Sequence, residues 1–252
     1  MRAEDSSSAN ASRLRTFSKS SGFARAFFIR RSDGGAVRIL KIENIGSDCY
    51  KIATESAEFF LRAEYLRFVR EEELCEDAEF LEEREEDLLF AGFAFAAEKK
   101  AVSYLERCEQ CRAGLQKKLA QKSFEKNAVE AALDYLERRN FLSDARFARA
   151  WLNSHRIAKP QGRARLSAEL ASRGIARQVS ENALREFFEE NGEEELCMRA
   201  LKKRVREKKS GEKLVAALQR DGFSYKMIRA VMAEFEEEAS KLLDAKSADI
   251  SE

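Results

Sequence analysis

Five cysteines and a single histidine are the side chains best suited to metal or redox chemistry. Cys108 and Cys111 form a C-x-x-C pair, a spacing used for zinc binding or thiol–disulfide exchange. A structural zinc site needs about four nitrogen or sulfur ligands, but no second pair follows and His155 lies far along the chain. A thioredoxin-like role needs a βαβ setting, whereas the spacing around this pair is helical. We therefore expect cysteines on helix faces in a reducing compartment, with no metal and no cofactor.

Motifs for other kinds of catalysis are absent from the sequence. It contains no G-x-x-x-x-G-K-[ST] phosphate loop, no G-x-G-x-x-G after a strand and no G-x-S-x-G elbow. One histidine leaves little room for a catalytic triad. Paired carboxylates are common, but on Glu-rich helices they form a solvated surface more often than an acid–base pair. We predict that the chain is not an enzyme, and an enzyme using Cys108 and Cys111 stays as a minor alternative that predicts bound metal or thiol reactivity.

Basic side chains are better candidates for a binding function. The net charge is only +1, but acidic residues crowd positions 71–87 while Lys and Arg dominate positions 99–213. A basic surface attracts nucleic acid or a nucleoprotein, whereas the acidic run repels phosphate. Because Glu residues are interspersed, ordinary solvated helix faces are the competing interpretation. The candidate partner-binding or DNA-binding residues are Lys117, Lys118, Arg146, Arg149, Arg156, Lys159, Arg163, Arg165, Lys202, Lys203, Arg206, Lys208, Lys209 and Lys213.

The elements that carry these residues are predicted to be helices, since Pro occurs once and charged residues make up 36% of the chain. The start of the chain differs, because an apolar run at 27–29, a turn at 32–35 and a second run at 37–42 indicate a hairpin. A further turn at 44–48 leads to an apolar run at 49–52, so we expect a small meander. Helical spacing is predicted from Glu55 onward.

A repeat is the most informative pattern in the sequence. Each copy has two leucines four residues apart, followed at fixed distances by two further apolar residues. Three copies occur, and they start about 50 residues apart. Each copy predicts a short helix, a turn and a second helix, and apolar positions before it predict a third helix. The anchor positions are Leu115, Leu119, Phe124 and Leu133, then Leu166, Leu170, Ile175 and Leu184, then Leu214, Leu218, Phe223 and Met232.

Glycine occupies the turn of two copies, at Gly174 and Gly222. A glycine just past the last helical turn adopts the left-handed conformation, and the apolar residue after it folds back onto the helix. The first copy has Ser123 there, so its turn should be less favourable. Ser143 and Ser224 are predicted to cap the helices that follow them.

The predicted fold is all-α, with three tandem three-helix repeats stacked in an elongated curved array and a small N-terminal β-meander plus helix. The predicted segments are a disordered basic tail at 1–21, the meander and a helical segment with the acidic run at 22–94, repeats at 95–142, 143–191 and 192–243, and a polar tail at 244–252.

The stretch from Leu136 to Trp151 resembles the signature of the RecX family, written L-x-x-x-x-[YF]-[LI]-x-D-x-x-[FY]-A. Matching segments follow at residues 162–166, 170–175 and 218–223, so the resemblance covers about residues 95–235. It implies a small helical regulator without enzymatic activity that binds RecA recombinase filaments and modulates strand exchange and ATP hydrolysis. This sequence departs from the pattern at Ser143, often acidic, and at Ser123, often glycine.

We therefore expect a regulatory protein of DNA repair and recombination that binds the RecA nucleoprotein filament through its basic residues and inhibits it. A sequence-nonspecific DNA-binding repeat protein is the alternative, because three-helix units with basic flanks resemble helix-turn-helix proteins. No segment approaches the roughly 18 apolar residues of a membrane span, and the start of the chain lacks a secretory signal. We expect a cytoplasmic monomer.

Overall fold

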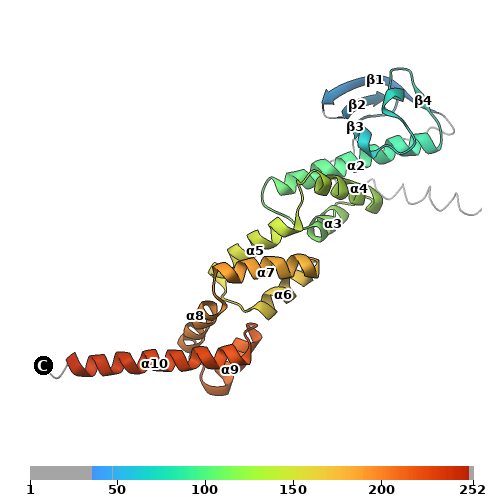
Figure 1. The fold of residues 1–252 in the computed structure, drawn as a ribbon. Helices are drawn as coiled ribbons and strands as arrows, with labels where there is room; N and C mark the ends of the chain where they lie inside the picture. The colour runs from blue at the N-terminus through green and yellow to red at the C-terminus, as the bar shows by residue number, and fades with distance from the viewer. Residues whose placement is uncertain (1–35, 47, 250–252) are drawn as a thin grey trace, which may run out of the picture. The chain divides into compact units, whose positions relative to one another are not determined.

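The computed structural model describes residues 36–46 and 48–249, with side chains throughout except at 156–158, 239 and 241–249 (Figure 1). The predicted basic tail, the apolar run at 27–29 and the turn at 32–35 lie outside the described residues. The chain divides into two compact units, Met1–Leu142 and Ser143–Glu252, which we call unit 1 and unit 2.

Unit 1 contains a four-stranded antiparallel sheet in the order β3-β2-β1-β4. The predicted turn at 44–48 is confirmed, since Gly46 at the end of β1 pairs with Cys49 at the start of β2. The strands are β1 Val37–Gly46, β2 Cys49–Thr54, β3 Glu58–Arg62 and β4 Glu79–Phe80.

The prediction of helical spacing from Glu55 is wrong, because β3 occupies this segment. Phe59 and Leu61 are buried while Phe60 between them is 37% exposed, which is the alternation of a strand. Two short 3₁₀ helices, η3 Ala63–Tyr65 and η4 Glu71–Glu73, lead from β3 to β4.

Helices make up the rest of the described chain and come in three groups of three, so the predicted helical repeat fold is confirmed (Figure 1). The predicted boundary between residues 94 and 95 falls inside α2, and α10 continues past residue 244 to Asp249. The helices are α2 Glu83–Leu105, α3 Arg112–Ala120 and α4 Lys126–Arg138, then α5 Asp144–Ala158, α6 Arg163–Ser172 and α7 Arg177–Glu190, then α8 Glu193–Arg206, α9 Gly211–Arg220 and α10 Tyr225–Asp249.

The repeated anchor residues form the cores of the three helix groups. All of them are buried except Phe124 and Met232, which are half-buried. In the third group Ile228 and Val231, on the same helix as Met232, are buried, the only such residues among the described side chains of α10. The fixed spacing therefore corresponds to equivalent inward-facing positions.

Equivalent turns join the second and third helices of every group. Ser123, Gly174 and Gly222 all have left-handed backbone conformations, with φ of +63°, +81° and +96°. In each turn the next amide bonds back to the helix, as in a Schellman motif. These bonds join the nitrogens of Phe124, Ile175 and Phe223 to the carbonyl oxygens of Leu119, Leu170 and Leu218 at 3.3, 3.2 and 3.2 Å.

Both predicted serine caps are confirmed. The Ser143 hydroxyl accepts a hydrogen bond from the Arg146 amide at 3.3 Å, and Ser224 accepts one from the Met227 amide at 3.2 Å. Each bond satisfies one of the amide donors that the first helical turn leaves unpaired.

Ser123→Gly is expected to stabilise unit 1 by about 0.5–1 kcal/mol, because serine pays a steric cost at positive φ that exceeds the extra chain entropy of glycine. Urea denaturation followed by circular dichroism measures the change. Ser224→Gly is the control, since this serine has no positive φ and the change removes its cap bond. An unchanged or lower midpoint for Ser123→Gly would contradict the prediction.

Candidate anion-binding groove

The predicted basic residues are spread over both units rather than gathered in one site. Lys117 and Lys118 lie on α3 in unit 1, and all the others lie in unit 2. Arg146, Arg149 and Arg156 lie on α5, Lys159 in the α5–α6 connection, Arg163 and Arg165 on α6, Lys202, Lys203 and Arg206 on α8, Lys208 and Lys209 after it, and Lys213 on α9.

Several of these cations pair with carboxylates on the surface. One of these pairs joins Arg149 Nε to Glu186 Oε2 at 2.7 Å. Such exposed pairs contribute little to stability but lower the charge that a partner meets. Further pairs are Arg163–Glu193 at 3.9 Å, Arg165–Glu169 at 3.1 Å, Lys202–Glu238 at 3.4 Å and Lys209–Glu207 at 3.1 Å.

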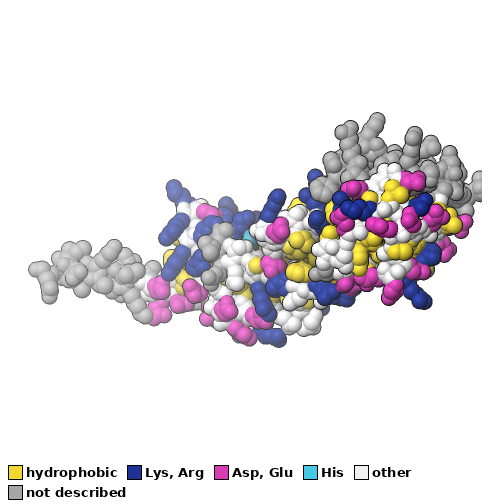
Figure 2. Space-filling view, turned by 90° about the horizontal axis from the view of Figure 1, so that it is seen from above, with side chains coloured by type: hydrophobic (Ala, Val, Ile, Leu, Met, Phe, Trp, Pro, Cys, Tyr) yellow, Lys and Arg dark blue, Asp and Glu magenta, His cyan; other side chains and the backbone are white. Residues whose placement is uncertain are grey.

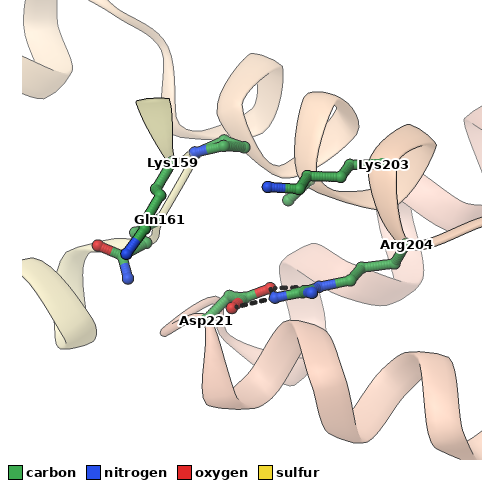
Figure 3. Close-up of a pocket in the computed structure, with 7 residues that line it drawn as sticks. Lys159, Gln161, Lys203, Arg204 and Asp221 are labelled. Atoms are coloured by element: carbon green, nitrogen blue, oxygen red, sulfur yellow. Dashed lines mark hydrogen bonds and ion pairs between the residues drawn. The ribbon is translucent and has the colours of Figure 1, made fainter. Parts of the chain in front are cut away.

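Unit 2 holds a cavity of about 300 Å³ between the α5–α6 connection, α8 and the α9–α10 turn (Figure 3). A second hollow lies next to the first, since Gln161, Arg204 and Asp221 line both, and we call the two neighbouring hollows together the basic groove. The first hollow is also lined by Lys159, Pro160, Ala200 and Lys203, and the second by Arg165, Lys209, Ala217 and Arg220.

A close contact between two glycines positions the walls of the basic groove. The Gly162 amide donates a hydrogen bond to the Asp221 carbonyl oxygen at 2.9 Å. A Cβ atom on Gly162 would lie 2.4 Å from the Gly222 carbonyl oxygen, and one on Gly222 would lie 2.5 Å from the Arg165 amide nitrogen. Only glycine allows this approach. The start of α6 is therefore held directly against the turn between α9 and α10.

An ion pair between Arg204 and Asp221 forms the wall shared by the two hollows (Figure 3). The guanidinium donates to the Asp221 carboxylate at 2.8–2.9 Å and to Glu207 at 2.9 Å. The hydrogen bonds to Asp221, and to a smaller extent the one to Glu207, raise the pKa of Arg204. Hydrogen bonds from Arg204 and Lys209 lower the pKa of Glu207. Arg204 is thus fixed in the wall of the groove, and its positive charge is largely neutralised by Asp221 and Glu207.

Lys159 and Lys203 supply charge that is not balanced in this way. Both side chains are exposed, and neither makes an ion pair with any residue in the described part of the chain. Figure 3 shows Lys203 extending from α8 into the space between Gln161 and Arg204. On the face seen in Figure 2, Lys and Arg side chains over the C-terminal helices gather along one edge, and the opposite edge carries Asp and Glu together with further Lys and Arg.

The side chain of Gln161 contacts His155 of α5, which in turn packs on Trp151 of the same helix. Its Oε1 atom lies 2.9 Å from Nε2 of His155. The His155 ring stacks on Trp151 with centroids 4.6 Å apart, and the Arg173 guanidinium lies 4.4 Å from the Trp151 centroid. Trp151 is therefore occupied by packing within unit 2.

Sequence reasoning found Lys159, Arg165, Lys203 and Lys209 of the basic groove but missed Gln161, Arg204, Arg220 and Asp221. Arg204 and Asp221 are 17 residues apart, a separation without a helical or strand period, so their pairing left no local signal. Pro160 and Gly162 indicated a loop, but not the backbone contact that this loop makes.

The cysteines show separate environments. Cys108 is exposed and Cys111 is buried, and the Gln110 amide donates to the Cys108 sulfur at 2.9 Å. Burial raises the pKa of Cys197 to about 12. The described residues include no cluster of three or more His, Cys, Asp or Glu side chains placed to hold a metal ion.

Among the described helices, none combines the length and apolar character needed to cross a lipid bilayer.

The fold and groove define a helical repeat protein with a cationic surface, and comparisons with known proteins identify its family. Residues 143–184 match the family described as "RecX, second three-helix domain". "Regulatory protein RecX" of Treponema pallidum (strain Nichols) is 40% identical over 144 residues, which are 57% of this chain and 88% of that protein. "Regulatory protein RecX" of Vibrio parahaemolyticus is 30% identical over 148 residues, 57% of this chain and 93% of that protein.

The chain belongs to the RecX family of regulatory proteins. Two solved structures share its fold. One, described as "Crystal structure of regulatory protein RecX", has a TM-score of 0.62 at 20% identity and covers 78% of this chain and 99% of its own. RecX from Lactobacillus salivarius has a TM-score of 0.50 at 18% identity, covering 57% of this chain and 97% of its own.

Proposed function

We propose that this protein binds RecA recombinase filaments and modulates their strand exchange and ATP hydrolysis, with inhibition as the expected direction. It acts by binding and without catalysis of its own. We expect it to work in the cytoplasm, in DNA repair and recombination, as a monomer.

The observation that carries the proposal is the basic groove in a member of the RecX family. The groove has lysines with unbalanced charge on two elements, and its walls are fixed by the contact between Gly162 and Gly222. A fixed cationic surface suits a polyanionic partner such as a nucleoprotein filament. The exposed cations elsewhere on unit 2 would extend this surface.

Fluorescence anisotropy of the labelled chain, titrated with RecA filaments assembled on single-stranded DNA, tests the proposal. We expect saturable binding at moderate salt that is tighter than binding to the same DNA without recombinase. No binding to filaments at moderate salt would contradict the proposal.

A sequence-nonspecific DNA-binding protein is the second candidate, favoured by the lysines of the basic groove. It predicts equal affinity for naked and recombinase-coated DNA, and a steep fall in affinity as salt rises. The same titration with naked duplex and single-stranded DNA separates the two functions.

A further inference from the structure

We propose that the basic groove of unit 2 binds the phosphodiester backbone of a nucleic-acid strand. The inference rests on the proposed function, in which the partner is a nucleoprotein filament that presents both protein and DNA. It assigns the groove to the DNA component.

The charge of the groove points to an anion. Lys159, Arg165, Lys203, Arg204, Lys209 and Arg220 line it, and Asp221 is the acidic residue in its lining. Arg204 is matched by Asp221, while Arg165 and Lys209 pair with glutamates beside the groove. Lys159 and Lys203 remain, on opposite walls of the first hollow. An anion entering there meets two ammonium groups that form no ion pair with any described residue, while the Asp221 carboxylate of the same hollow is paired with Arg204.

The availability of hydrogen-bond donors favours phosphate over a protein carboxylate. Folded proteins bind carboxylates most specifically through two parallel bonds from an arginine. In the basic groove the Nε atoms of all three arginines are already engaged, by Glu169, Asp221 and the Ala216 carbonyl. Lysine ammonium groups act as point charges that suit phosphates approaching in varied orientations.

The shape of the groove suits a strand rather than a small anion or a base. The two hollows share Gln161, Arg204 and Asp221, so the cationic lining continues from one into the other. Its apolar lining consists of Pro160, Ala200 and Ala217, which offer no aromatic surface on which a base could stack. Contacts to phosphate alone carry no sequence information, so binding in the groove should not depend on base sequence.

The test measures how strongly the full chain binds a fluorescein-labelled oligothymidine, without recombinase, as salt is raised. The variant is Lys159→Ala/Lys203→Ala, two exposed positions whose loss should not affect folding. Losing two phosphate contacts should lower the slope of log affinity against log salt by about 1.4, at roughly 0.7 per contact with a single strand. Lys226→Ala/Arg229→Ala, which removes two exposed charges of α10 outside the groove, is the matched control.

The conservative variant Lys159→Arg/Lys203→Arg should restore the slope, because it keeps both charges. An unchanged slope for the alanine variant, or equal loss in the Lys226→Ala/Arg229→Ala control, would overturn the assignment. So would an alanine variant that keeps DNA binding but loses binding to recombinase without DNA, because the groove would then hold an acidic protein surface.

Failure of the proposed function has a different signature. If the wild-type chain binds oligothymidine through the two lysines but does not bind recombinase filaments, the groove assignment stands and the filament proposal falls.

Discussion

Glu98→Ala is expected to lower the free energy of unfolding of unit 1 by about 3–5 kcal/mol, the cost of breaking a buried ion pair by removing one partner. Glu98 on α2 accepts hydrogen bonds from Arg62 of β3 at 3.0 and 2.6 Å and from the Tyr65 hydroxyl at 2.8 Å. The Arg62 and Glu98 side chains are each only 8% exposed. Removing the carboxylate leaves the Arg62 charge buried without its counter-ion.

The surroundings of this pair explain why water does not easily replace Glu98. The Arg62 guanidinium lies 4.3 Å from the Tyr135 ring centroid and 5.5 Å from that of Phe95. Burial raises the pKa of Tyr65, and the Glu98 charge raises it further, so its phenol stays protonated and donates to Glu98. The network joins β3 to α2, and the ring of Tyr135 on α4 packs against the Arg62 guanidinium.

Hydrogen exchange followed by mass spectrometry is the appropriate measurement, because it reports the two units separately. We expect Glu98→Ala to lower protection in peptides of β2, β3 and α2 while peptides of unit 2 keep theirs. Glu64→Ala is the matched control, since its pairs with Arg138 and Arg139 are partly exposed and should contribute at most about 1 kcal/mol. Equal effects of the two substitutions would contradict the buried-pair interpretation.

Gly222→Ala is expected to destabilise unit 2 by about 2–5 kcal/mol, from two causes. Its φ of +96° costs an L-residue about 1–2 kcal/mol. The new methyl group would also lie 2.5 Å from both the amide nitrogen and the Cβ of Arg165, and overpacking of this kind adds about 1–3 kcal/mol. Because one of the crowded atoms belongs to the backbone, relief requires separating α6 from the α9–α10 turn.

Fluorescence of Trp151, the one tryptophan in the chain, follows the unfolding of unit 2 in urea. Gly211→Ala separates the two costs, since Gly211 has φ of +55° but no atom within 4 Å of an added Cβ. It should cost only about 1–2 kcal/mol. A Gly222→Ala effect no larger than that of Gly211→Ala would mean that the close contact does not hold the groove together.

The helical repeat was predictable because its signals are local. Leucines four residues apart define an inward face, and a left-handed residue followed by an apolar one defines the end of the helix. The strand β3 was not predictable in this way. Phe59, Phe60 and Ala63 fit a helical face as well as a strand, and pairing with β2 decides between them. That pairing depends on tertiary contacts that periodicity does not record.

The basic groove was predictable only in part for the same reason. Clusters of lysine and arginine indicated which helices carry positive charge, and four of the groove residues came from those clusters. Whether the positive charge of each of these residues is neutralised in the folded protein depends on carboxylates from other elements. Asp221 forms an ion pair with Arg204, and Glu193 forms one with Arg163, which lies 30 residues away in the sequence. Lys159 and Lys203 form no ion pair with the described residues. No spacing in the sequence distinguishes a balanced arginine from an unbalanced lysine.

The central claim, that this protein regulates recombinase filaments, is tested most directly by the rate of ATP hydrolysis of RecA on single-stranded DNA with and without the chain. We predict that the rate falls as the wild-type protein is added, and falls less with the Lys159→Ala/Lys203→Ala variant. If the rate of ATP hydrolysis stays the same at concentrations of the wild-type protein that saturate its binding to oligothymidine, the result would contradict the account.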